Sequence, residues 1–337
     1  MKITKPPIDF ACPACHSALG SNPGAFFCHV CSREFPILFG IPDFRLRPDP
    51  YLTLHEERSK AEKLFEYNAS CFAELLKYYY EITDDVPEEL ASRYISYHEN
   101  AVSQSQIAAE ELRISPDSRV LDAGCGSGGG LIACSQYSKN LVGVDIALRW
   151  LVICKKRLEE VGLPATLVCA DVESMPFKKE CFDRILASDL LENVYSTEGA
   201  LKALSETLVP RGRVWFCGAN RYTLGPHPST RIWGIGYLPR NVRRMLLKRV
   251  RGVDSLRFSN LISPGQIAHT IEKQGDHLLH LGPKKICLST LQSHTYTEKF
   301  LIRIYIALIS TRFLSRIILR IGPVFEGTFK KKRNHEQ

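Results

Sequence analysis

Residues 119–128 read Arg119-Val-Leu-Asp-Ala-Gly-Cys-Gly-Ser-Gly128, a short apolar run that leads into a glycine-rich turn. An apolar run bounded by glycines is typical of a buried strand, and the residues after the turn favour a helix. A glycine turn between a strand and a helix lets the backbone approach a bound ligand closely. Taken alone the turn is a weak signal, so its meaning depends on the sequence that follows.

Four more short apolar runs follow the turn, with amphipathic segments between them. They read NLVGVD, TLVCAD, DRILAS and RVWFCG, and they begin at residues 140, 166, 183 and 213. The clearest intervening helix is LVICKKRLEEVG, which begins at residue 151. Strands that alternate with helices predict an α/β fold with a doubly wound, mostly parallel sheet.

Carboxylates stand at the ends of the predicted strands. Asp122 precedes the glycine turn, Asp145 ends the second strand, Asp171 ends the third and Asp189 ends the fourth. Open α/β sheets bind ligands at the carboxyl ends of their strands, and a carboxylate after the second strand can accept hydrogen bonds from ribose hydroxyls. The order of these residues therefore predicts a site for a nucleoside-containing ligand.

The ordered segments resemble motifs I to post-III of class I S-adenosylmethionine-dependent methyltransferases, over about residues 113–220. The resemblance implies a Rossmann-like core with S-adenosyl-L-methionine as cofactor. It implies a role for each matching position: the methionine end with Asp122, Gly124, Cys125, Gly126 and Gly128, the ribose with Asp145 and the adjacent Ile146, the adenine with Asp171 and Val172, and the sulfonium with Asp189. For any one of these residues the alternative is a turn glycine or a helix-capping carboxylate.

An NAD-binding site is the main alternative within the same fold. Gly124, Gly126 and Gly129 also satisfy the Gly-x-Gly-x-x-Gly pattern of that site. However, Asp122 would face a cationic amine in S-adenosylmethionine but a pyrophosphate in NAD. The charge of Asp122 and the later CADVESMPF segment therefore favour the methyltransferase interpretation.

Two Cys-x-x-Cys pairs near the N-terminus, Cys12–Cys15 and Cys28–Cys31, are separated by twelve residues. Two such pairs can close a tetrahedral site of four thiolates around Zn²⁺, a structural site because no coordination position stays open. His16 and His29 are alternative ligands. Residues 10–44 resemble the zinc ribbon at the front of many bacterial methyltransferases, and also the free-standing zinc-ribbon activator subunit of methyltransferases that modify tRNA and proteins.

The chain is expected to have four parts. Residues 1–48 form the zinc ribbon, 49–112 a helical linker or lid, and 113–220 the core that binds S-adenosylmethionine. Residues 221–337 are expected to contain an acceptor lid, the completion of the sheet and a basic amphipathic extension.

The methyl acceptor is less clearly indicated. Candidate general bases near the fourth and fifth strand ends are Asp189, Glu192, Tyr195, Tyr222 and His227. Asn193 stands where many family members that act on small molecules have histidine. An Asn-Pro-Pro-Tyr loop and a Pro-Cys nucleophile are absent, which argues against amide, adenine and pyrimidine C5 chemistry. For His227 the alternative is a surface histidine.

About +6 of the net charge of +8 lies after residue 293, where nine Lys or Arg face three Glu. Arg312, Arg316 and Arg320 recur at four-residue intervals among Leu and Ile, as in a helix that lies on an anionic membrane or packs with solvated arginines. An RNA methyltransferase could use Arg240–Arg251 and Lys330–Arg333 to hold phosphates. Arg33 is the one Lys or Arg between Cys12 and Ile41, so the ribbon itself offers little for RNA.

The sequence thus favours methyl transfer to oxygen or nitrogen of a small-molecule or lipid-linked acceptor, with an RNA methyltransferase as the alternative. A scaffold that binds cofactor without turnover is the third interpretation, and the intact motifs argue against it. The start MKITKPPIDF has no apolar signal region, and no run of 18 apolar residues occurs. We therefore expect a cytoplasmic protein with peripheral contact to anionic membranes, and nucleic acid is the less favoured partner.

Overall fold

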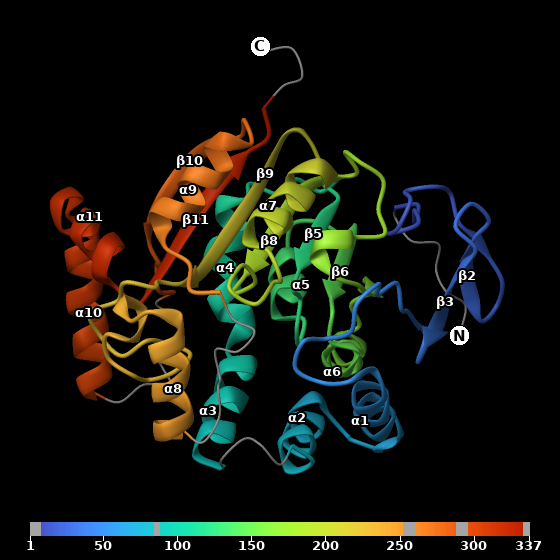
Figure 1. Cartoon of the computed structure of the whole chain (residues 1–337), viewed down its shortest axis with the longest axis horizontal. Helices are drawn as coiled ribbons and strands as arrows, with labels where there is room; N and C mark the ends of the chain where they lie inside the picture. The colour runs from blue at the N-terminus through green and yellow to red at the C-terminus, as the bar shows by residue number, and fades with distance from the viewer. Residues whose placement is uncertain (1–7, 84–87, 252–259, 288–295, 333–337) are drawn as a thin grey trace. The chain divides into compact units, whose positions relative to one another are not determined.

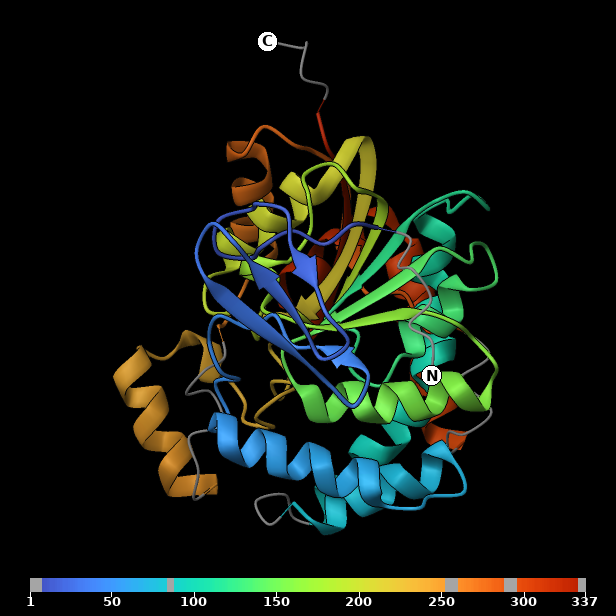
Figure 2. The same cartoon turned by 90° about the vertical axis from the view of Figure 1, so that its right-hand side faces the viewer.

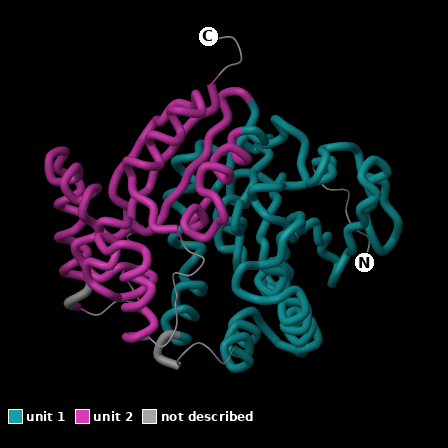
Figure 3. Tube along the Cα trace, in the orientation of Figure 1, with its two compact units in different colours: residues 1–186, 206–209 teal, residues 187–205, 210–337 magenta. Residues whose placement is uncertain are grey.

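The computed structural model describes residues 8–83, 88–251, 260–287 and 296–332. The chain divides into two compact units, which Figure 3 distinguishes by colour. Unit 1 comprises residues 1–186 and 206–209, and unit 2 comprises residues 187–205 and 210–337. Neither unit is therefore one continuous stretch of chain.

Unit 1 begins with a four-stranded antiparallel ribbon, which consists of β1 (Gly20–Ser21), β2 (Ala25–Cys28), β3 (Arg33–Leu38) and β4 (Ile41–Pro42). Its small core is aromatic. The rings of Phe10, Phe26 and Phe35 each lie 5.1–5.3 Å from the ring of Phe44, measured between centroids. The cluster reaches the main domain, since the ring of Phe10 also lies 6.1 Å from that of Phe177. A core this small would still be stabilised strongly by a further cross-link.

Four helices follow the ribbon, in the region predicted to be helical. They are α1 (Leu54–Glu66), α2 (Phe72–Glu81), α3 (Glu88–Glu99) and α4 (Ala101–Glu111). A capping box begins α1, because Thr53 and Glu56 each accept a hydrogen bond from the other's backbone N–H. Figure 2 shows α1 lying along α6 (Leu148–Glu160), the helix that follows the second strand of the main sheet.

The parallel part of the main sheet contains β5 (Val120–Ala123), β6 (Leu141–Asp145), β7 (Thr166–Cys169) and β8 (Phe182–Ser188). Its order is β8-β5-β6-β7, and all three pairings are parallel. The short helix α5 (Gly129–Cys134) and α6 connect the first three strands (Figure 1). Most residues of these strands are buried, as expected for a sheet that helices cover on both faces.

Unit 2 supplies the antiparallel part of the sheet and further helices. Strand β11 (Val324–Lys330) pairs with both β9 (Leu208–Ala219) and β10 (His277–Pro283) in antiparallel fashion. The full strand order is β10-β11-β9-β8-β5-β6-β7. The predicted α/β class with a mostly parallel sheet, a small N-terminal ribbon and helical additions is confirmed. The helices of this unit are α7 (Thr197–Thr207), α8 (Arg240–Arg251), α9 (Pro264–Lys273), α10 (Tyr296–Ser310) and α11 (Arg312–Ile321).

The structure divides the basic segment that the sequence presents as one amphipathic stretch. The predicted basic amphipathic extension contains two helices here, because α10 ends at Ser310 and α11 begins at Arg312. After them, β11 carries the buried Phe325 and Phe329 between two neighbouring strands. Lys330 therefore belongs to the sheet, and the expected basic tail is in part a sheet strand. Within the described ranges, every helix is too short or too polar to cross a membrane.

Candidate functional site

The glycine turn after β5 requires its glycines. Gly124, Gly126 and Gly128 have φ angles of 76°, 47° and 80°, in the left-handed region that only glycine adopts without strain. Gly128 caps α5, and a Cβ added at Gly130 would come within 2.4 Å of Asp122 Oδ2. The turn therefore brings the backbone and the start of a helix directly over the end of β5, where a ligand can be held closely.

Two buried or half-buried carboxylates flank this turn. Asp145 at the end of β6 accepts hydrogen bonds from the backbone N–H groups of Gly126 and Ala147, each at 2.9 Å. Asp122 is 3% exposed and accepts from the backbone N–H of Leu131. Burial, and then the charge of Asp145, raises the pKa of Asp122 to about 7, and burial raises the pKa of Asp145 to about 6. A cationic group here would stabilise both carboxylates in their charged form.

The remaining predicted cofactor positions lie at the ends of β6 and β7. Asp171 follows β7, is 3% exposed, and accepts a hydrogen bond from the backbone N–H of Glu173 at 2.9 Å. The adjacent Val172 is buried, and Cys125 in the glycine turn is 6% exposed. The carbonyl oxygen of Ile146 accepts from Arg45 at 3.1 Å. Unit 1 thus gathers its predicted cofactor residues at the carboxyl edge of three adjacent strands.

Asp189 and Glu192 lie together in unit 2, after β8. Asp189 has a φ of 49° and donates its backbone N–H to the carbonyl of Cys217 at 3.2 Å. Glu192 is 6% exposed, and its Oε1 accepts from the backbone N–H of Ala219 at 3.1 Å. Among the described residues its Oε2 has no hydrogen-bond partner. Burial, and then the charge of Asp189, raises the pKa of Glu192 to about 8. This carboxyl group can therefore exchange a proton near neutral pH.

Lys284, just after β10, joins this group and was not predicted from the sequence. Its Nζ lies 3.5 Å from Cys217 Sγ, which in turn lies 3.6 Å from Asp189 Oδ1. Although burial lowers it, the pKa of Lys284 is raised overall by Cys217 and Asp189. The side chain therefore keeps its positive charge in a largely buried place. The only sequence signal is a Lys-Lys pair directly after an apolar run, which is too common to indicate a site.

The other three candidate bases, Tyr195, Tyr222 and His227, also belong to unit 2. Tyr195 is 44% exposed, and Tyr222 packs its ring 5.4 Å from that of Tyr237. His227 is 1% exposed, and its Nδ1 accepts from the backbone N–H of Ser229 at 3.3 Å. The alternative of a surface histidine is therefore wrong. Burial, and then the charge of Arg243, lowers the pKa of His227 to about 4, so the ring is neutral at physiological pH.

The four cysteines of the ribbon converge on one point. The Sγ atoms of Cys12, Cys15, Cys28 and Cys31 all lie within 4.8 Å of one another. Cys12 pairs with Cys31, and Cys15 with Cys28, each at 3.5 Å between sulfur atoms. Four thiols at the corners of one small volume fit a tetrahedral Zn²⁺ ion, with Zn–S distances of roughly 2.3 Å. His29 instead packs its ring 4.7 Å from that of Phe27.

Comparison with known proteins shows that part of the chain is similar in sequence to methyltransferases. Residues 121–216 match the family described as "Methyltransferase domain". Sterol 4-C-methyltransferase strm-1 of Caenorhabditis elegans is 30% identical over 107 residues, which are 31% of this chain and 32% of that protein. Ubiquinone biosynthesis O-methyltransferase of Chromobacterium violaceum is 32% identical over 106 residues, which are 31% of this chain and 45% of that protein.

Demethylmenaquinone methyltransferase of Streptomyces avermitilis is 29% identical over 145 residues, which are 42% of this chain and 61% of that protein. The chain thus spans between about a third and three fifths of the length of these relatives. The matched family covers β5 to β8, the glycine turn and most of β9.

Proposed function

We propose that this protein transfers a methyl group from S-adenosyl-L-methionine to oxygen or nitrogen of a small-molecule or lipid-linked acceptor. The observation that carries the proposal is the arrangement of Asp122 and Asp145 around the glycine turn. Their raised pKa values favour a ligand with positive charge, as the amino group and sulfonium of this cofactor have. A pyrophosphate at the turn would be repelled by Asp122, which speaks against NAD. The match of residues 121–216 to a methyltransferase domain supports the same conclusion.

Different residues of the chain would have separate roles in methyl transfer. When bound, the cofactor supplies a methyl carbon that carries a good leaving group. Asp122 would attract the amino group of its methionine end, Asp145 would accept hydrogen bonds from the ribose, and Asp171 from the adenine amine. The glycine turn lets the backbone lie against the ligand. In a displacement of this kind the protein gains most of its rate by aligning the two partners and excluding water.

An acceptor hydroxyl or amine must also lose a proton, and Glu192 is our candidate base. Its Oε2, which has no hydrogen-bond partner in the described part of the chain, and its pKa of about 8 suit that task. The carboxylate form predominates above the pKa, so the rate should rise with pH through about pH 8. We expect Glu192→Gln to lower the rate by about 10²–10⁴-fold and to abolish this rise. The measurement is a pH–rate profile with the identified acceptor.

A matched control is Asp276→Asn. Asp276 is another buried carboxyl group of unit 2 with a raised pKa. It lies directly before β10, whereas Glu192 lies after β8. This variant should keep the pH profile of the wild type. An unchanged profile in Glu192→Gln would show that the acceptor needs no base at this position.

The acceptor class can be found by incubating the protein with methyl-labelled cofactor and fractionated cell extract. We expect label in lipids or soluble metabolites after nuclease treatment. The relatives named above are a sterol 4-C-methyltransferase, an O-methyltransferase of ubiquinone biosynthesis and a demethylmenaquinone methyltransferase, which supports an apolar small acceptor. Label that enters RNA and disappears with nuclease would favour the alternative, an RNA methyltransferase that uses α8 and Lys330–Arg333.

The helices α10 and α11 support contact with an anionic membrane. Phe300, Leu301 and Ile304 on α10, and Phe313 on α11, are 64%, 63%, 40% and 70% exposed. None of the residues of α11 is buried, and this helix carries three arginines and no acidic residue. Apolar side chains beside arginines are typical of a helix that lies in a membrane interface. We therefore include reversible attachment to anionic lipid in the proposed function.

We expect the protein to co-sediment with vesicles that contain phosphatidylserine, but not with vesicles of phosphatidylcholine alone. Phe300→Ser with Phe313→Ser should lose this binding, and each arginine of α11 replaced by glutamine should cost about 1 kcal/mol. Substitutions are needed rather than truncation, because β11 follows these helices in the chain. The control is Val30→Ser, since Val30 is an apolar residue of the ribbon with 72% exposure. Equal sedimentation of all variants would contradict the membrane contact.

A further inference from the structure

The segment that connects the ribbon to α1 runs along the ends of β6 and β7. Asp43 forms a parallel bridge with Cys169, the last residue of β7, and the backbone N–H of Phe44 donates to the carbonyl of Cys169 at 2.7 Å. Asp171 follows two residues later. The segment Asp43–Tyr51, which we call the connector, therefore begins as an extension of the sheet beside the predicted adenine position.

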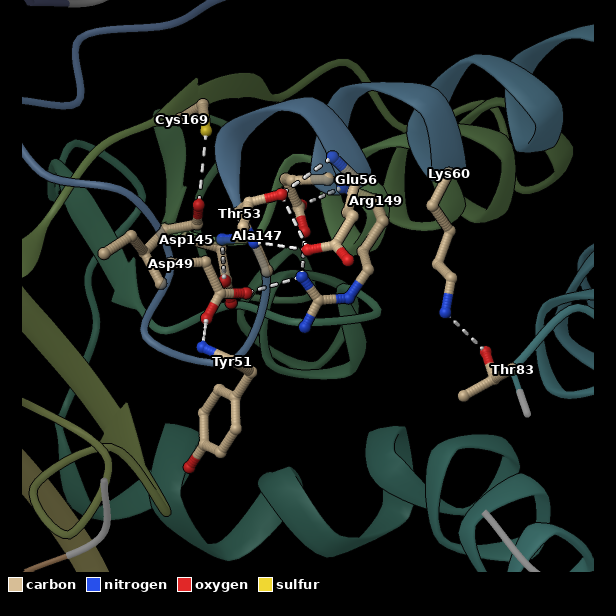
Figure 4. A network of polar contacts seen from close by, with 12 residues as sticks. Asp49, Tyr51, Thr53, Glu56, Lys60, Thr83, Asp145, Ala147, Arg149 and Cys169 are labelled. Atoms are coloured by element: carbon tan, nitrogen blue, oxygen red, sulfur yellow. Dashed lines mark hydrogen bonds and ion pairs between the residues drawn. The ribbon is translucent and has the colours of Figure 1, made fainter. Parts of the chain in front are cut away.

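At every second position of the connector, the side chains of Arg45, Arg47 and Asp49 form polar contacts with residues that follow β6 and β7. Arg45 is buried, forms a two-pronged ion pair with Asp43, and donates to the carbonyl of Ile146 at 3.1 Å. Asp49 accepts from Nη1 of Arg149 at 2.5 Å, and Arg149 lies in the first turn of α6, just after Asp145 (Figure 4). The connector is thus bonded to the end of β7 and to the residues that follow β6, the two strand ends where adenine and ribose are predicted to bind.

Arg47 lies between these two attachments and is bound to Asp171. Its Nε donates to Asp171 Oδ2 at 2.9 Å, its Nη2 contacts the same oxygen, and Nη2 lies 3.5 Å from Glu173 Oε2. The other oxygen, Oδ1, accepts from the backbone N–H of Glu173. Each carboxylate oxygen can accept two hydrogen bonds, so among the residues that the structure describes Oδ1 keeps one position for a further donor. Arg47 therefore fixes the rotamer of Asp171 and leaves an acceptor available.

We propose that Arg47 is a positioning residue for adenine recognition, which acts by holding Asp171 ready for the exocyclic amine of the cofactor. The connector is then a wall of the adenosine pocket as well as a link between two domains. This inference rests on the proposed function, because it takes S-adenosylmethionine as the ligand. It adds a residue outside the methyltransferase domain to cofactor binding, since Arg47 lies 74 positions before the first matched residue, Leu121.

The test is a pair of calorimetric titrations, with S-adenosylhomocysteine and with its 6-deamino analogue, which lacks the exocyclic amine. Arg47→Ala should weaken binding of S-adenosylhomocysteine by about tenfold, the size of one well-placed hydrogen bond to a charged group. It should leave binding of the 6-deamino analogue unchanged. Arg47→Lys, which keeps the charge, should recover part of the loss.

Two further variants make the readout specific. Asp145→Ala should weaken both ligands equally, because both have the ribose hydroxyls. Lys178→Ala removes an exposed ion pair with Asp9 at 3.6 Å, also between the ribbon region and the core, and should change neither titration. Arg47→Ala leaves the buried Asp171 without its cation and should lower the thermal unfolding midpoint, but the two titrations compare two ligands on the same folded variant.

Each contrary result overturns a defined part of the scheme. Wild-type affinity of Arg47→Ala for S-adenosylhomocysteine, or an equal loss for both ligands, overturns the positioning role while the proposed function stands. Tighter binding by Arg47→Ala also overturns it, since it would show that Arg47 competes with adenine. A wild-type protein that binds neither S-adenosylhomocysteine nor its 6-deamino analogue overturns both the positioning role and the proposed function.

Discussion

Replacing Cys12 and Cys28 together by serine is expected to abolish zinc binding and to unfold the ribbon. The wild-type protein should carry one zinc ion per chain, because its four thiols converge within 4.8 Å. The aromatic core around Phe44 is small, so metal binding must supply much of the folding free energy, on the order of 10 kcal/mol or more in comparable small domains. Elemental analysis measures the metal, and limited proteolysis measures the fold of residues 8–44.

Cys71→Ser is the control for this experiment. Cys71 lies outside the cluster, directly before α2, and its replacement should leave the metal content at one per chain. A wild-type protein that contains no metal and still resists proteolysis through residue 44 would contradict the prediction. Since the connector begins at the end of the ribbon, we also expect the double variant to bind S-adenosylhomocysteine more weakly.

Arg149→Met is expected to reduce the free energy of unfolding by about 3–5 kcal/mol, the largest effect on stability of any single substitution considered. The side chains of Asp49 and Glu57 are 1% and 0% exposed, and Nη1 of Arg149 contacts both. Glu57 also accepts from the backbone N–H of Arg149 at 2.9 Å. Removal of the guanidinium would leave two buried carboxylates without their cation. Urea denaturation measures the change.

Two comparisons test the cause of that loss. Arg119→Met breaks a partly exposed ion pair, in which the side chain of Arg119 is 38% exposed and that of Asp183 is 29% exposed. This substitution should cost less than about 1 kcal/mol. Adding Asp49→Asn and Glu57→Gln to Arg149→Met should recover part of the stability, because the buried negative charges are then gone. A loss below about 1 kcal/mol in Arg149→Met would show that water reaches these carboxylates.

The parallel half of the sheet could be predicted because each of its strands is a short apolar run followed by a carboxylate. Strand β11 could not, since VFEGTFK places Glu326 in its middle and stands directly before a run of basic residues. Glu326 is nevertheless 1% exposed, beside Lys285, whose Nζ lies 3.9 Å from its Oε1. Val324, Phe325, Thr328 and Phe329 favour a strand, but the pairing with β9 and β10 that buries Glu326 follows from the fold.

The residues of the candidate site also differ in whether the sequence alone could indicate them. Asp122, Asp145 and Asp171 could be found from the sequence because strand ends meet at one edge of a parallel sheet. Arg47 could not, because its partner Asp171 lies 124 positions away and RLRPDPY indicates only a proline-rich connection. Lys284 was missed for the same reason, since Cys217 lies 67 positions before it. Contacts of this range follow from the fold and leave no spacing pattern.

The position of β11 has a consequence for folding during synthesis. This strand lies between β9 and β10, yet it follows both in the chain, so these two strands cannot complete their hydrogen bonds until residue 330 has left the ribosome. The strands β5, β6 and β7 pair with one another and emerge much earlier. We therefore expect nascent chains that end before β11 to expose unpaired strand edges, the kind of surface that chaperones bind and that promotes aggregation.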